Sequence, residues 1–180
     1  MASVKKSKVD LYQIRSESGS GSCAWADIVL VLGEKSVSVM ITSDYGSFDY
    51  LWNGCGMPPK EFLCGLNFDY AMKKLTNYKL NVPDTEKYPD EIKERIAEAL
   101  ENECVTKEEA SEIQSELLEI CDEFQYSREL LNYSLYNHSS FEKIFGDSEA
   151  LPSATTINQK AIDFWNDIWV HFIVELKKEI

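Results

Sequence analysis

Four short strand-like runs dominate the first third of the chain: three alternate between apolar and polar residues, and the second is almost wholly apolar and β-branched. They cover residues 9–15, 24–32, 36–42 and 48–52. A period of two is typical of a β-strand that buries one face, and the Gly-containing breaks between the runs are typical of turns. The pattern predicts an antiparallel meander of about four strands.

The third run shows most clearly which face is buried. Val37, Val39 and Ile41 fall on one side of the strand, with Ser and Thr largely on the other. Residues 43–46 (Ser-Asp-Tyr-Gly) supply a tight turn to the fourth run, and a Ser/Gly-rich segment at 16–22 connects the first two runs. One face of the sheet therefore needs a cover.

The expected cover is a single helix that starts at Pro58 or Pro59 and runs to Leu75. Proline is tolerated in the first turn of a helix, and the segment that follows has a broad apolar surface. Aromatic and Met side chains at helical spacing normally pack in a core rather than hold a cofactor. The predicted core residues of this helix are Phe62, Leu63, Leu66, Tyr70 and Met72.

The chain after residue 83 has helical periodicity. One helix is expected from Pro89 and a second from Thr106, where Thr106 and Glu109 have the spacing of a capping box. The two form a helical hairpin whose outer faces are rich in glutamate. Shorter helices are expected from Ser127 and from Ser140.

A last helix is predicted over residues 157–178, capped by Thr155 or Thr156. It carries Trp165 and Trp169 and must be buried on much of its surface. The fold class is therefore α+β: an antiparallel meander covered by helices, then a mostly helical C-terminal half. We expect residues 1–83 and 84–180 to form one compact unit.

Composition narrows the classes of protein. A hydrophobic share of 44% and an aromatic share of 12% exclude an intrinsically disordered chain. The start of the chain is basic and polar, and the apolar run 24–32 is too short to cross a bilayer. We expect a cytoplasmic protein.

The net charge of −13 is concentrated in the middle of the chain. Residues 84–124 hold 4 Lys and Arg against 15 Asp and Glu, a net charge of −11. Such a segment repels nucleic acid and anionic membranes, so direct binding to either is not expected. A basic protein is the favoured partner.

Cysteine and histidine provide no pattern for a metal site. The five cysteines have no metal-ligand spacing, and neither His138 nor His171 has ligand-type neighbours. We expect no cofactor. Cys64 and His138 are a conceivable nucleophile and base, but a buried, inert cysteine is the better interpretation.

No phosphate loop, dinucleotide fingerprint or nucleophile elbow occurs in the chain. The remaining candidates for chemistry lie at the 43–46 turn, where Asp44, Tyr45 and Asp49 place two carboxylates near a hydroxyl. A small enzyme that uses them is one hypothesis. The alternative is that an Asp preceding such a turn accepts backbone N–H bonds within it.

The glutamates of the acidic helices are the more informative feature. Residues four apart on a helix are about 6 Å apart along its axis, comparable with the distance between successive phosphates of a DNA strand. Such a row can imitate a nucleic-acid backbone, although a solvated helix face is the alternative. The candidate partner-binding residues are Glu94, Glu98, Glu101, Glu108, Glu112, Glu116 and Glu119.

Two stretches carry a resemblance. Residues 41–52, which contain Ser-Asp-Tyr-Gly and end in Trp52, are followed at 60–75 by a segment containing Phe-Leu and Asp-Tyr. This pattern resembles a group of small phage- and prophage-encoded proteins of unassigned function. The resemblance covers about a fifth of the chain and transfers no catalytic residue. It implies a mobile-element protein that acts in a bacterial cytoplasm, where small acidic proteins often look like inhibitors of host defence or modulators of host enzymes.

The sequence therefore favours a protein that binds a basic partner, such as a host nucleic-acid-binding protein, without catalysis. A small enzyme that uses the turn carboxylates is the first alternative. A homo-oligomeric structural protein, assembled through the Trp165 and Trp169 helix, is the second.

Overall fold

The alternating segments form a four-stranded antiparallel sheet in the computed structural model, which describes residues 3–4, 6–17, 23–124 and 127–180. The strand order is β1-β2-β3-β4, so the predicted meander is confirmed. Of the expected connection at 16–22, residues 18–22 lie outside the described residues. The strands are β1 Asp10–Glu17, β2 Cys23–Leu32, β3 Val37–Ser43 and β4 Gly46–Trp52.

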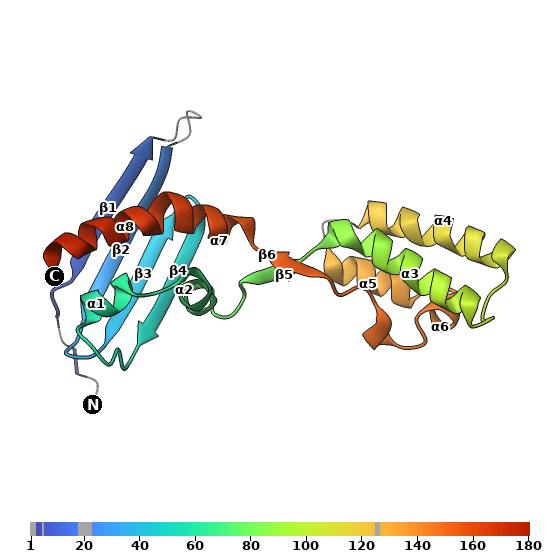
Figure 1. Ribbon diagram of the computed structural model, residues 1–180, viewed down its shortest axis with the longest axis horizontal. Helices are drawn as coiled ribbons and strands as arrows, with labels where there is room; N and C mark the ends of the chain where they lie inside the picture. The colour runs from blue at the N-terminus through green and yellow to red at the C-terminus, as the bar shows by residue number, and fades with distance from the viewer. Residues whose placement is uncertain (1–2, 5, 18–22, 125–126) are drawn as a thin grey trace. The chain divides into compact units, whose positions relative to one another are not determined.

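The face predicted to be buried is the one that the helices cover. Val37 and Val39 are fully buried and Ile41 is nearly so. The register pairs Ile41 with Ile28 of β2 and with Phe48 of β4, so apolar side chains of three strands meet on this face. Figure 1 shows the C-terminal helical segment lying across it, and the protein is α+β as predicted.

The prediction of a single helix from Pro58 or Pro59 to Leu75 is wrong, because the segment forms two helices. These are α1 Pro59–Cys64 and α2 Phe68–Leu75. Gly65 ends α1, and the Asn67 side chain caps α2 by accepting the Tyr70 N–H at 2.9 Å. An Asx cap favours an extended conformation at its own position, so it starts a new helix rather than continuing the old one.

The C-terminal helical segment begins later than predicted. Thr155 and Thr156 belong to the short strand β6 Thr155–Ile157, and the cap is Asn158, whose side chain accepts the Lys160 N–H. The segment then runs through α7 Gln159–Phe164, the π-helical turn η3 Trp165–Trp169 and α8 Val170–Leu176, and ends in the 3₁₀ turn η4 Lys177–Glu179.

This C-terminal segment belongs to the same core as the sheet. Phe164, Trp169 and Phe172 are at most 1% exposed and pack in the cluster formed by the inner sheet face. At the end of the chain, Lys60 Nζ donates to Glu179 Oε2 at 2.6 Å and lies 2.9 Å from Asp10 Oδ2. These two carboxylates raise the pKa of Lys60, Asp10 foremost. The ion pairs therefore tie the C-terminus to α1 and β1.

The chain divides into two compact units. Unit 1 comprises Met1–Asn81 and Ile157–Ile180, and unit 2 comprises Val82–Thr156. Unit 2 is thus inserted into unit 1, and the C-terminal helical segment groups with the sheet rather than with the acidic hairpin. The expected boundary near residue 83 lies close to the start of the insertion, whereas the return to unit 1 at residue 157 was not expected.

Unit 2 is built from helices around a core of its own. The predicted capping box at the start of α4 is confirmed: Thr106 Oγ1 accepts the Glu109 N–H, and Glu109 Oε2 accepts the Thr106 N–H. Short 3₁₀ turns, η1 Thr85–Lys87 and η2 Ser148–Ala150, and strand β5 Asn81–Pro83 accompany the helices. The helices are α3 Tyr88–Glu101, α4 Lys107–Glu123, α5 Arg128–Tyr136 and α6 Phe141–Ile144.

Candidate protein-binding surface on the acidic unit

Charge is divided very unequally between the two units. Unit 2 contains 6 Lys and Arg against 19 Asp and Glu, whereas unit 1 contains 12 of each. The entire net charge of −13 therefore lies in unit 2. The potential around unit 2 favours basic ligands, whereas unit 1 has no net preference.

Helix α4 carries its glutamates on the side opposite its core. Ile113 and Leu117 are buried in the core of unit 2, while Glu112, Glu116 and Glu119 are exposed. At 100° per residue, Glu108, Glu112 and Glu119 fall within a narrow stripe on this outer side. All seven candidate residues are exposed: Glu94, Glu98 and Glu101 on α3, and Glu108, Glu112, Glu116 and Glu119 on α4.

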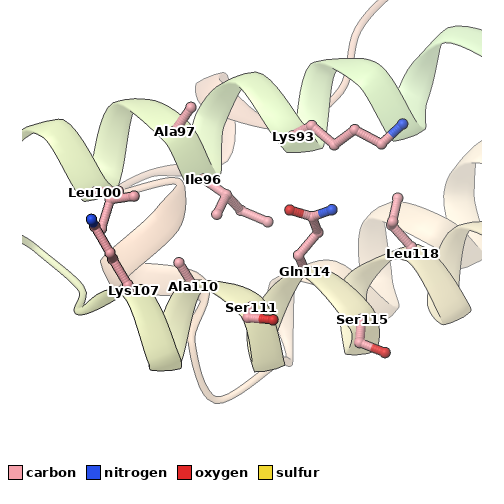
Figure 2. Close-up of a pocket in the computed structure, with 10 residues that line it drawn as sticks. All are labelled: Lys93, Ile96, Ala97, Leu100, Lys107, Ala110, Ser111, Gln114, Ser115 and Leu118. Atoms are coloured by element: carbon pink, nitrogen blue, oxygen red, sulfur yellow. The ribbon is translucent and has the colours of Figure 1, made fainter.

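The seven carboxylates do not form one continuous face, because a groove separates the two helices. The groove has a volume of about 600 Å³. Figure 2 shows Ile96 and Gln114 in its middle, Leu100 beside Lys107 at one end, and Lys93 opposite Leu118 at the other. Its remaining lining residues are small: Ala97, Ala110, Ser111 and Ser115.

Two of the seven carboxylates have partners within unit 2. Glu98 pairs with Arg95 at 2.9 Å, one helical turn away on α3. Glu116 Oε2 lies 3.0 Å from His138 Nε2. The other five form no ion pair or hydrogen bond in the part of the chain that the structure describes: Glu94, Glu101, Glu108, Glu112 and Glu119.

The pairing of Glu116 follows from the tautomer of His138. The Ser140 N–H donates to His138 Nδ1 at 3.2 Å, so that nitrogen bears no proton. The proton of the neutral ring is therefore on Nε2, which donates to Glu116. Nearby, Lys143 Nζ donates to Glu109 Oε1 at 3.1 Å. The Thr106 N–H and Lys143 together lower the pKa of Glu109. These contacts hold the segment around α6 against one side of α4.

Sequence reasoning located the glutamates but missed the groove between them. The spacing of Ala97 on α3, and of Ser111 and Ser115 on α4, contains the necessary signal. These small residues are neither part of the apolar stripe nor part of the glutamate stripe, and a helical wheel places them between the two.

The 43–46 turn does not bring its candidate residues together as a catalytic group. Asp44 Oδ2 accepts the Trp25 N–H of β2 at 3.1 Å, and the turn itself is bonded by Ser43, whose hydroxyl donates to the Gly46 carbonyl at 2.7 Å. The expectation that Asp44 accepts N–H bonds within the turn is therefore wrong in detail, since it is the Ser43 hydroxyl that accepts the Tyr45 N–H, at 3.2 Å. Asp49 is exposed on the outer face of the sheet.

Tyr45 is also occupied by a structural contact. Its hydroxyl donates to Asp167 Oδ2 at 2.6 Å, which joins the turn to the π-helical segment. This hydrogen bond, followed by burial, raises the pKa of Tyr45 to about 12. The hydroxyl is therefore a firmly held donor and a poor general base at neutral pH.

Cys64 and His138 belong to different units, and the thiol is not activated. Burial is the main cause that raises the pKa of Cys64, although Lys177 acts in the opposite direction. A thiol with a raised pKa carries little thiolate at neutral pH, and the thiolate is the nucleophile.

The Trp pair proposed as an oligomer contact lies in the core of unit 1. Trp169 is 1% exposed, and Trp165 is partly buried and stacks on it at a centroid distance of 5.7 Å. These side chains stabilise unit 1 and present little surface to a second copy.

The described residues provide neither a metal site nor a membrane-spanning helix. No group of three or more His, Cys, Asp and Glu residues in these ranges is arranged to hold a metal ion. Nor does any described helix combine the length and the apolar character that crossing a bilayer requires.

The fold and the surface define an α+β protein that combines a neutral sheet unit with an inserted acidic helical unit. A family model described as a phage family matches residues 2–179, so the chain belongs to that phage family. The match spans both units. No curated protein and no solved structure shows significant similarity to the chain.

Proposed function

We propose that this phage protein binds a basic protein of its bacterial host without catalysis, through the carboxylates of α3 and α4. In this proposal it acts in the host cytoplasm and inhibits its partner by occupying a surface that otherwise binds nucleic acid. The observation that carries the proposal is the set of five exposed, unpaired carboxylates in the unit that holds the whole net charge.

Physical chemistry supports a basic partner over other ligands. Leaving two unpaired carboxylates on α3 and three on the neighbouring α4 costs repulsion in the free protein, and a cationic partner relieves that repulsion on binding. The concentrated charge also accelerates encounter with a basic surface, and this effect weakens with salt.

The spacing supports competition with nucleic acid. Glu108, Glu112 and Glu116 follow one another at intervals of four residues along α4, which is about 6 Å per step. Lys and Arg side chains that are arranged to bind successive phosphates can engage such a row.

The first experiment identifies the partner. The tagged protein is captured from host cells, and bound proteins are determined by mass spectrometry. Capture is then repeated with Glu112→Lys/Glu119→Lys, which reverses two exposed mid-helix carboxylates of α4. The control is Glu34→Lys/Asp49→Lys, which changes the net charge of the chain equally but in unit 1.

We expect the α4 variant to lose the partner and the control to retain it, with both keeping the far-UV CD spectrum of the wild type. Capture of the wild type should weaken as salt is raised. Equal capture by the two variants would refute the proposal. Displacement of the captured partner from DNA or RNA by the wild-type protein tests the inhibitory part.

A further inference from the structure

We propose that the groove between α3 and α4 binds a basic amphipathic helix of the partner. The inference rests on the proposed function and adds to it the form of the bound segment: a helix that places an apolar stripe in the groove and Lys or Arg on either side.

The floor of the groove is suited to apolar side chains. Ile96 and Ala110 are buried beneath it, and Leu100 and Leu118 are partly buried along its walls. Gln114 points into the groove in Figure 2 and has no hydrogen-bond partner among the described residues. Its amide is thus free to bond with a polar group of a bound segment.

The borders of the groove carry the unpaired carboxylates. On α3, Glu94 and Glu101 lie three residues before and four residues after the lining residue Ala97. Residues three or four apart are neighbours on a helix surface, so both border the groove.

The α4 side has the same arrangement. Glu108 lies three residues before Ser111, and Glu112 and Glu119 lie three before and four after Ser115. The five carboxylates that border the groove are therefore the same five that lack partners. The two paired ones, Glu98 and Glu116, stand at neither spacing from these lining residues.

This coincidence identifies the chemistry of the occupant. Anionic borders on both sides of an apolar floor complement a helix that is apolar on one face and cationic on both flanks. A row of carboxylates alone would bind any cationic surface. An apolar floor between two such rows favours a helix with one apolar face over other cationic surfaces.

The two lysines of the groove do not oppose this arrangement, because they lie at its ends. Lys93 forms an ion pair with Asp90 at 3.0 Å. Lys107 is the first residue of α4 and has no partner among the described residues. The middle of the groove is free of charge.

The dimensions also suit a helix. On α4 the lining residues run from Lys107 to Leu118, about 17 Å along the helix axis, which is enough to accompany roughly three turns of a partner helix. Ala97, Ser111 and Ser115 are small and exposed, so a docked helix axis can come within the usual distance of about 8–10 Å.

The test uses two synthetic peptides of about 16 residues with the same Leu and Lys composition. In the first, Leu recurs at i, i+3, i+4 and i+7; in the second, the order is scrambled so that the Leu residues share no face. Affinity is measured by fluorescence anisotropy in 150 mM and 500 mM NaCl (about physiological and well above), and helix formation by CD.

We expect the amphipathic peptide to bind at least about tenfold more tightly than the scrambled one, with a gain in helix content. Ala97→Phe/Ser115→Phe fills the groove and keeps every carboxylate, and it should weaken the amphipathic peptide by at least about tenfold. Ser139→Phe adds one such ring to the exposed surface of unit 2 outside this groove and should change little.

The outcomes separate the two proposals. If the two peptides bind alike, or if the groove-filling variant binds like the wild type, the groove inference is overturned. If binding still falls with Glu112→Lys/Glu119→Lys, the proposed charge-based function stands without it. Absence of any binding to the amphipathic peptide also overturns the groove inference. If the CD spectrum of Ala97→Phe/Ser115→Phe differs from that of the wild type, Ala97→Leu replaces it. Ala97→Leu should also weaken binding of the amphipathic peptide.

Discussion

Replacing Phe164 by Ala should destabilise unit 1 and leave unit 2 unaffected. Phe164 is fully buried, and its ring centroid lies 4.7 Å from that of Phe48 and 6.4 Å from that of Trp169. The sheet and the C-terminal helical segment hold the ring from both sides, so the cavity left by Ala cannot collapse easily. We expect a loss of about 3–5 kcal/mol in the free energy of unfolding of unit 1.

The distribution of aromatic residues provides a probe for each unit. All four tryptophans lie in unit 1: Trp25, Trp52, Trp165 and Trp169. Tryptophan fluorescence therefore reports the unfolding of unit 1, whereas far-UV CD reports the helices of both units. With an m-value of about 2 kcal/mol per molar urea, the fluorescence midpoint should fall by about 2 M.

The matched control is Phe145→Ala in unit 2. Phe145 is 6% exposed and packs 5.5 Å from Phe141 in the second core, which shares no residue with the first. This variant should lower the urea midpoint of the part of the CD transition that reports unit 2. It should leave the fluorescence midpoint unchanged. If either variant shifts both probes together, in one coincident transition, the two cores unfold as one and the reasoning is refuted.

Three further outcomes follow from local contacts. Thr106→Ala should cost unit 2 about 1 kcal/mol, because the α4 capping box is lost, and Thr106→Ser should restore most of it in CD-monitored urea unfolding. Asn67→Ala should cost unit 1 about 1 kcal/mol by fluorescence, because the α2 cap is lost, while Asn67→Asp retains stability. Because the pKa of Tyr45 is raised to about 12, its bond to Asp167 contributes stability that is present below pH 10 and lost as the pH rises towards 12. Tyr45→Phe should therefore lower the fluorescence midpoint at pH 7 and flatten its decline between about pH 10 and 12.

Each of these outcomes has a clear opposite. A Thr106→Ala variant as stable as the wild type would show that the capping box contributes nothing. The Asn67 cap would be dispensable if the Ala and Asp variants unfolded alike. An unchanged alkaline slope in Tyr45→Phe would mean that another group titrates there.

The sheet could be predicted from sequence because its signal is local. Val37, Val39 and Ile41 alternate with polar residues, and consecutive strands pair with their neighbours, so the pattern specifies both the buried face and the order. The start of α4 was equally accessible, because a capping box involves residues only three apart.

The predictions that failed concern a side-chain cap that starts a new helix and contacts between segments far apart in the sequence. Periodicity continued across Gly65, and the sequence did not show that the Asn67 side chain would cap a new helix there. The return of the chain to unit 1 depends on contacts between the C-terminal helical segment and a sheet formed more than a hundred residues earlier. No local pattern carries that information.

The candidate surface was predictable in part. Exposure of the seven glutamates follows from their position opposite the apolar stripes of α3 and α4. Which of them remain unpaired depends on Arg95, on the same helix, and on His138, which comes from the loop before α6 and is brought close only by the fold. The groove depends on how the two helices pack, which the sequence pattern suggests but does not determine.

The way the chain enters and leaves unit 2 has a consequence for how this family can evolve. Within unit 1, the Asn158 N–H donates to the Leu80 carbonyl at 2.9 Å, and within unit 2 the Asp84 N–H donates to the Ala154 carbonyl at 2.9 Å. The outgoing and returning segments are thus held together by a hydrogen bond within each unit. Insertions whose ends lie side by side are tolerated by a host domain. Unit 2 can therefore be shortened, removed or replaced without rebuilding the sheet of unit 1, so members of this phage family can change the acidic unit in a single exchange.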